Sequence, residues 1–188
     1  MPVLNEVAQK AGDRLRFSVV HDQAFFEALH TPHKRFTPTC DHETYMALLG
    51  QSEVSLMPLA DTPFNRAKSD LKFIEAGACR VASVASNVMY SDSVEDGRTG
   101  LLFRDADELR DRLLRLVAMP ELARALGDAA RHYVAGERML AYQVGQRIAW
   151  YRSLWERRDE LNRALQARLA ELPNNQPTIS ALDMSLAR

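Results

Sequence analysis

The chain has 188 residues, enough for one α/β domain with an extension, and its formal net charge of -1 at pH 7 argues against general binding to nucleic acid or to an anionic membrane. Its two cysteines, Cys40 and Cys79, are too few for a disulfide framework, and no apolar run approaches the roughly 20 residues that span a bilayer. Because the first residues also lack a secretory signal pattern, we expect a cytoplasmic protein with no transmembrane segment and no nucleic-acid partner.

The first part of the chain alternates short apolar runs with helical segments. The pattern predicts strands at residues 15–20, 34–37, 54–57, 80–84 and 101–103. Helices are expected before and between them, at residues 4–11, 23–29, 42–49 and around Glu75. Asp41 and Ser69 are the predicted N-caps of the last two helices. Strands that alternate with helices over short connections form a parallel sheet, so the predicted fold class is a doubly wound α/β sheet.

Helices alone are predicted after the last strand. Residues 105–118 carry leucines at helical spacing, and Pro120 begins a second helix because proline fits a first turn. A longer helical segment, residues 139–172, mixes aromatic and apolar side chains with many charges but keeps no strict heptad. The predicted division is an α/β domain at residues 1–135, a helical extension at residues 136–172 and a flexible tail at residues 173–188.

A polar segment after the third predicted strand carries the most chemistry. It contains Lys68, Ser69 and Lys72 at the predicted start of a helix, followed by Glu75. A helix N-terminus attracts anions, and two lysines four residues apart are expected on one helical face. Glu75 lies one step further, where its carboxylate can accept hydrogen bonds from sugar hydroxyls. The segment therefore predicts a site for a phosphorylated ligand.

The same residues also have structural interpretations, which the sequence leaves open. Ser69 can cap a surface helix, and Lys72 with Glu75 can form a solvated ion pair worth a few tenths of a kcal/mol. His21 and Asp22 are either a ligand-contacting pair or the end of a strand followed by a helix N-cap. The remaining histidines occur without a cysteine pair, so no zinc site is expected.

Several enzyme signatures are absent from the sequence. It contains no Gly-x-Gly-x-x-Gly motif, no Walker-type loop and no Gly-x-Ser-x-Gly elbow. The pair Gly97 and Gly100 is by itself weak evidence for a phosphate loop, since glycines at these positions also suit an ordinary turn. Dinucleotide-binding, P-loop and common hydrolase functions therefore lack their signatures here.

A set of motifs in a fixed order resembles a known family. These motifs are residues 54–59, then Phe64-Asn65-x-x-Lys68-Ser69-x-x-Lys72-x-x-Glu75-Ala76, then Arg80-Val81-Ala82-Ser83, then Asp96-Gly97-x-x-Gly100-Leu101-Leu102. The chain resembles the C-terminal, donor-binding domain of GT-B-fold glycosyltransferases, in the class called glycosyl transferases group 1. The similarity covers about residues 4–134. It implies a Rossmann-like half of a GT-B fold followed by C-terminal helices.

The resemblance also implies a function and a set of site residues. Glu75 matches the glutamate that binds the ribose hydroxyls of the donor nucleotide, and Lys68 and Ser69 would face the diphosphate or the sugar. The other predicted donor-binding residues are Lys72, Asn65 and Asp22, and residues 87–90 would border the pocket. The implied reaction moves a sugar from a nucleotide diphosphate sugar to an acceptor, in polysaccharide or glycoconjugate biosynthesis. The donor is a substrate, no cofactor or metal is expected, and the sequence assigns no catalytic residue.

The sequence departs from the family pattern in ways that leave an alternative open. Ala67 stands where the family often has a first glutamate, with Asp61 and Asp70 as the nearby carboxylates. The resemblance implies an N-terminal acceptor-binding domain as a partner, and this sequence does not include it. The alternative is a non-catalytic, degenerate GT-B half that acts as an assembly module. In either case the helix at residues 139–172 allows pairing with a second copy.

Overall fold

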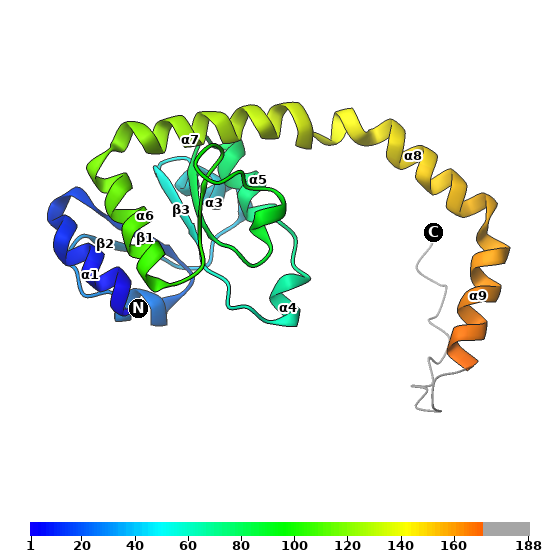
Figure 1. Ribbon diagram of the computed structural model, residues 1–188, viewed down its shortest axis with the longest axis horizontal. Coiled ribbons are helices and arrows are strands. Elements are labelled where there is room, and N and C mark those ends of the chain that lie inside the picture. The colour runs from blue at the N-terminus through cyan, green and yellow to red at the C-terminus, as the bar shows by residue number, and fades with distance from the viewer. Residues whose placement is uncertain (171–188) are drawn as a thin grey trace. The chain divides into compact units, whose positions relative to one another are not determined.

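The computed structural model describes residues 1–170 (Figure 1). The chain divides into two compact units, of which the first spans Met1–Met139 and the second begins at Leu140. The predicted tail and the last two residues of the predicted helical extension lie outside the described residues. No helix in the described part of the chain is long and apolar enough to cross a membrane.

Five parallel strands form the centre of the first unit. Strands β1 (Phe17–Val20) and β2 (Lys34–Thr37) form one ladder. Strands β3 (Val54–Met57), β4 (Ala82–Ser86) and β5 (Leu101–Phe103) form a second, in the order β3-β4-β5. All five predicted strands are confirmed. The predicted sheet consists of two hydrogen-bonded ladders within residues 1–170, and β4 begins two residues later than predicted.

Helices cover both faces of the three-stranded ladder, as expected for a doubly wound fold. On β4, Ala82 and Val84 belong to one apolar core while Ala85 belongs to another, because successive side chains point to opposite faces. The first core receives residues from α1 (Pro2–Ala11) and α6 (Ala106–Ala118). The second receives residues from α3 (His42–Leu49) and α5 (Leu71–Ala78). The doubly wound class predicted from the sequence is therefore confirmed.

The remaining elements connect or close these layers. They are η1 (Gly12–Arg14), α2 (Gln23–Ala28), α4 (Pro63–Arg66), η2 (Tyr90–Asp92), α7 (Pro120–Tyr133) and a π-helical turn, η3 (Val134–Arg138). The second unit contains α8 (Leu140–Glu156) and α9 (Arg158–Ala170). The single helix predicted from residue 139 is thus interrupted at Arg157. The one-turn helix α4 lies in a segment predicted as a loop.

One prediction about the site segment was wrong. The N-cap of α5 is Asp70 rather than Ser69, so Lys68 lies before the helix and does not share a helical face with Lys72. The cause is tertiary, because the carboxylate of Asp70 binds Arg138 and Ser93, far along the chain, and makes no capping bond to its own helix. Local sequence preference does not contain this information.

Candidate functional site

The candidate site begins in the turn that follows β3. Thr62 caps α4, since its Oγ1 accepts a hydrogen bond from the Asn65 backbone N–H at 3.2 Å, and Pro63 occupies the first turn. The Asn65 side chain donates from Nδ2 to the backbone oxygen of Ala60 at 2.8 Å. These bonds fold the predicted polar loop into a defined turn, which leads through residues 67–70 into α5. The side chain of Asn65 therefore has a structural role, because it bonds the backbone of the turn.

Lys68, Ser69 and Lys72 are all exposed. The ammonium of Lys68 lies 5.1 Å from the centroid of the Phe64 ring, and that of Lys72 lies 5.3 Å from the centroid of the Tyr45 ring. Within residues 1–170 neither lysine forms an ion pair with a carboxylate, so the ion pair between Lys72 and Glu75 considered from the sequence is not formed. Two cations therefore remain available to an anionic ligand.

Glu75 lies in the second turn of α5 and is largely covered, with 13% of its side chain exposed. Its Oε1 lies 3.4 Å from Nε2 of the exposed His42, at the start of α3. This contact is long for a hydrogen bond and leaves the second carboxylate oxygen without a partner in the described residues. A carboxylate this well covered and this weakly bonded can still accept hydrogen bonds from a ligand.

Asp70 lies between Ser69 and α5 but is already engaged. Its Oδ2 and Oδ1 accept hydrogen bonds from Nη1 and Nη2 of Arg138 at 2.6 and 2.9 Å, and Oδ2 also accepts one from Ser93 Oγ at 2.5 Å. The hydrogen bonds from Arg138 hold the pKa of Asp70 below its ordinary value, and Asp70 in turn raises the pKa of Arg138. Arg138 is 68 residues from Asp70, and no sequence signal pointed to it.

The second aspartate near the missing family glutamate is also engaged. Asp61 binds Arg66 through both carboxylate oxygens, at 2.5 and 2.6 Å. The bond to Arg66 lowers the pKa of Asp61. Neither aspartate near Ala67 is thus unpaired in the described structure.

Asp22 lies at the end of β1 and acts as a helix cap. Its Oδ1 accepts a hydrogen bond from the Phe25 backbone N–H at 2.9 Å, which satisfies an N-terminal donor of α2. His21 before it has a positive φ of 71° and places Nδ1 2.6 Å from Thr39 Oγ1. No hydrogen bond or ion pair within residues 1–170 connects Asp22 to α4 or α5. The contacts of His21 and Asp22 are thus those expected for a strand end followed by a helix N-cap.

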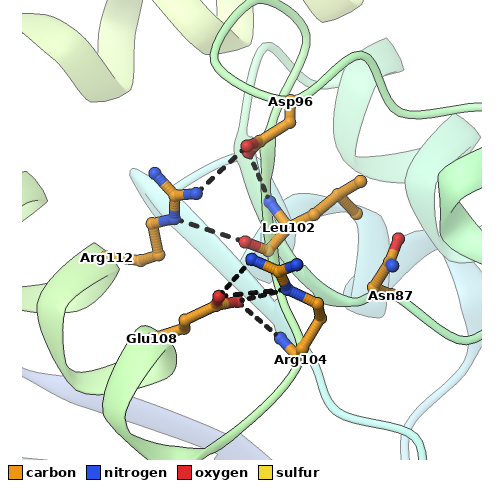
Figure 2. Close-up of a pocket in the computed structure, with 6 residues that line it drawn as sticks. All are labelled: Asn87, Asp96, Leu102, Arg104, Glu108 and Arg112. Atoms are coloured by element: carbon orange, nitrogen blue, oxygen red, sulfur yellow. Dashed lines mark hydrogen bonds and ion pairs between the residues drawn. The ribbon is translucent and has the colours of Figure 1, made fainter.

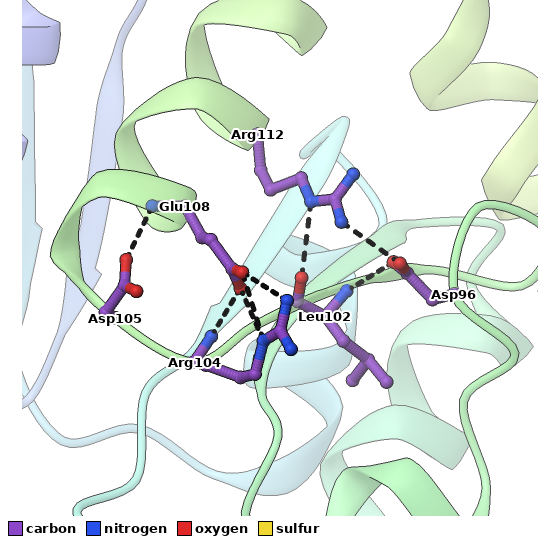
Figure 3. Close-up of polar contacts among 6 residues, drawn as sticks. All are labelled: Asp96, Leu102, Arg104, Asp105, Glu108 and Arg112. Atoms are coloured by element: carbon purple, nitrogen blue, oxygen red, sulfur yellow. Dashed lines mark hydrogen bonds and ion pairs between the residues drawn. The ribbon is translucent and has the colours of Figure 1, made fainter.

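A separate cleft of about 240 Å³ lies beside β5 (Figure 2). Its lining residues are Asn87, Asp96, Leu102, Arg104, Glu108 and Arg112. β5 is the edge of its ladder, and the backbone N–H and oxygen of Leu102 lie on its unpaired side, where side chains bond them. Asp96 accepts a bond from the Leu102 N–H at 2.8 Å, and Arg112 donates to the Leu102 oxygen at 3.3 Å and to Asp96 at 3.0 Å (Figure 3). The glycine-motif residue Asp96 therefore helps to close a sheet edge.

The other charges of this cleft neutralise each other. Glu108 accepts bonds from the backbone N–H of Arg104 at 2.9 Å and from its guanidinium, while Asp105 caps α6 through the Glu108 N–H at 2.8 Å (Figure 3). Bonding to Arg104 lowers the pKa of Glu108. Both arginines of the cleft are thus paired with carboxylates. The cleft is therefore a poorer site for a diphosphate than the α4–α5 segment, whose two lysines form no ion pair in the described part of the chain.

Comparison with known proteins gives the family. A family model described as Glycosyl transferases group 1 matches residues 3–119. The chain belongs to this family. The resemblance inferred from the motifs is therefore confirmed. No curated protein matches the chain significantly.

Solved glycosyltransferase structures share the fold. Sucrose-phosphate synthase from Thermosynechococcus elongatus is 24% identical over 82% of this chain and 42% of its own, with a TM-score of 0.65. HepE from Anabaena, solved with UDP and glucose, is 15% identical over 81% of this chain and 44% of its own, with a TM-score of 0.63. S. aureus TarM, in a complex that contains UDP, is 18% identical over 79% and 31%, with a TM-score of 0.63. The chain spans less than half the length of these structures.

Proposed function

We propose that residues 65–75 bind the nucleoside diphosphate of a sugar donor, and that the protein containing this chain transfers the sugar to an acceptor in polysaccharide or glycoconjugate synthesis. The observation that carries the proposal is that two exposed lysines, Lys68 and Lys72, and the covered carboxylate of Glu75 occur together on one short segment. Membership of the glycosyl transferases group 1 family supports the same assignment.

Each residue has a distinct chemical role in this proposal. The two ammonium groups bind the diphosphate and stabilise the charge that develops on it as the sugar departs. Ser69 donates its hydroxyl to a phosphate oxygen, and Glu75 accepts hydrogen bonds from the ribose hydroxyls. The donor is a substrate, and the proposal includes neither a cofactor nor a metal ion. HepE, solved with UDP and glucose, supports a donor of this chemical class.

The first test is thermal unfolding of the chain with UDP, GDP or ADP and with the matching nucleosides. A ligand at a hundred times its dissociation constant stabilises by roughly 2.7 kcal/mol, which raises the Tm of a chain of this size by about 5–10 °C. We expect such a shift with one of the diphosphates. If none of the three changes the Tm, the donor-site proposal fails and the degenerate assembly module is favoured.

Two variants then separate the roles by calorimetry. Lys72→Ala should weaken binding of the diphosphate about tenfold and leave the nucleoside unchanged, because only the phosphates contact the ammonium. Glu75→Gln should weaken both ligands, because both contain the ribose. Lys10→Ala, which removes an exposed lysine paired with Glu6 on α1, is the control and should change neither affinity. Equal losses for Lys72→Ala and Glu75→Gln on both ligands would contradict these roles.

A further inference from the structure

Asp70 places a negative charge in the segment that carries the two lysines of the proposed site. Asp70 follows Ser69 directly and precedes α5, so its carboxylate belongs to the stretch that carries Lys68 and Lys72. At this position an aspartate normally turns toward its own helix and accepts a bond from the second or third N–H. In that position it would repel a diphosphate and occupy N–H groups at the start of α5. The structure has no such capping bond.

The Asp70 carboxylate binds Arg138 instead of its own helix. Arg138 binds Asp70 in a bidentate manner, at 2.6 and 2.9 Å, and Ser93 completes the set at 2.5 Å. Only 12% of the Asp70 side chain is exposed, so the pair is shielded from solvent. A bidentate guanidinium fixes direction as well as charge, which a lysine would not do.

Arg138 is itself held in place by Tyr133 of α7, which in turn packs on α5. Its Nη1 lies 3.3 Å from the hydroxyl of Tyr133 at the end of α7, and its guanidinium lies 5.9 Å from that ring's centroid. The Tyr133 ring stacks on Phe73 of α5 at 5.9 Å between centroids, and Phe73 is fully buried. Arg138 ends the π-helical turn η3, whose wider turn is a feature often found at functional positions.

We infer that Arg138 is a positioning residue that neutralises Asp70 and holds its carboxylate away from the start of α5, leaving the segment cationic for the donor diphosphate. This inference rests on the proposed function. It assigns a role to a residue outside the segment that binds the ligand. It also explains why Asp70, at the N-cap position, makes no capping bond.

The test compares a single with a double variant by calorimetry, using whichever of UDP, GDP or ADP stabilises the chain. Arg138→Ala removes the positive charge and both guanidinium bonds from Asp70, leaves only the Ser93 hydroxyl to hold the carboxylate, and should weaken diphosphate binding about tenfold, with little change for the nucleoside. Arg138→Ala combined with Asp70→Asn removes the released charge and should return most of the affinity. A double variant as weak as the single one would overturn the inference, because Arg138 would then act only through stability.

Two controls keep the comparison interpretable. Arg110 on α6 is paired with Asp107, and its side chain is 26% exposed against 25% for Arg138. Arg110→Ala should therefore leave binding unchanged. Arg138→Gln keeps most of the stem against Tyr133 and should behave as Arg138→Ala does. If Arg138→Gln binds the diphosphate as the original chain does, the inference is wrong.

A measurement without nucleotide separates this inference from the proposed function. In an acid titration followed by NMR, the backbone amides of Lys72 and Phe73 should respond to Asp70 protonation in Arg138→Ala and not in the original chain. That response would mean that the released carboxylate caps α5. The same behaviour in both proteins would overturn the inference. If the original chain binds none of the three diphosphates, the proposed function fails and the titration still decides the role of Arg138.

Discussion

Ser83 and Ser86 are buried on the same strand, β4, yet their hydroxyl groups have different surroundings. Ser86 Oγ accepts a hydrogen bond from the Leu59 backbone N–H at 2.9 Å and so fixes the turn that leads to the candidate site. Ser83 Oγ is fully buried and has no partner in the described residues. A buried hydroxyl without a partner costs free energy, whereas a bonded one contributes.

Replacing these two serines by alanine should change the free energy of unfolding in opposite directions. Ser83→Ala should raise the free energy of unfolding by about 1 kcal/mol, because it removes an unsatisfied polar atom at almost constant shape. Ser86→Ala should lower it by about 1–3 kcal/mol, because it leaves the Leu59 N–H unpaired. Urea denaturation of both variants measures the two changes. A loss of stability in Ser83→Ala would mean that its hydroxyl has a partner.

Asp70 gives the chain a pH-dependent contribution to stability. Since its pKa in the folded chain is lowered by Arg138, its contribution is complete at neutral pH and is lost as the pH falls below the unfolded value of about 3.9. We expect Asp70→Asn to lower stability by roughly 2–3 kcal/mol between pH 6 and 8. The difference in Tm between the two proteins should stay constant in that range and shrink below about pH 4. A difference that grows on acidification would contradict this assignment.

At the level of elements, α7 packs very closely against residues 80–81, the two residues that precede β4. A Cβ atom on Gly127 would lie 2.1 Å from the backbone oxygen of Arg80, which cannot move aside as a side chain can. Arg80 itself has a positive φ of 61° and follows the C-cap of α5, where its N–H bonds to Gly77 and that of Val81 bonds to Ala76. The glycine in α7 therefore allows α5, α7 and β4 to meet.

This contact predicts a large effect for a small substitution. Gly127→Ala should destabilise the first unit by about 3 kcal/mol, because the added methyl group collides with backbone. Gly145→Ala is the matched control, since Gly145 also lies in a helix, α8, but has nothing within 4 Å of an added Cβ. There the substitution should be neutral or stabilise α8 by up to about 1 kcal/mol. Thermal unfolding of both variants by circular dichroism tests the contrast, which would fail if the two variants behaved alike.

At the level of the whole molecule, the second unit is the part with the most exposed aromatic surface. Trp150 and Trp155, both on α8, are 57% and 70% exposed, and they are the two tryptophans of the chain. Tyrosines 142 and 151 on the same helix are also exposed. Tryptophan emission therefore reports on α8 alone, free of signal from the α/β unit.

This property tests the predicted self-association through the C-terminal helix. If two copies pair through α8, acrylamide quenching of the tryptophan emission should decrease as protein concentration rises, with a parallel increase in sedimentation coefficient. Trp155→Ser should reduce the association and leave the Tm of the first unit unchanged. Constant quenching over the whole concentration range would contradict pairing through this helix.

The sequence by itself determined the alternation of strands and helices, the doubly wound class and the family. These follow from local patterns: apolar runs mark β3, β4 and β5, Asp41 caps α3, and Pro120 begins α7. The segment with Lys68, Lys72 and Glu75 could also be found, because charge and spacing are visible along the chain. Each of these features depends on residues close together in sequence.

The tertiary structure alone decided how the charges of the site are used. Ser69 was predicted as the cap of α5, but Asp70 holds that position and turns its carboxylate to Arg138, 68 residues away. Likewise, the glycine turn after Asp96 is visible in the sequence, but that the Asp96 carboxylate bonds the edge of β5 together with Arg112 is not. Side chains such as these find partners through the packing of α5, α6 and η3 on the sheet. That packing brings distant residues together, and no local pattern in the sequence encodes which carboxylate will meet which cation.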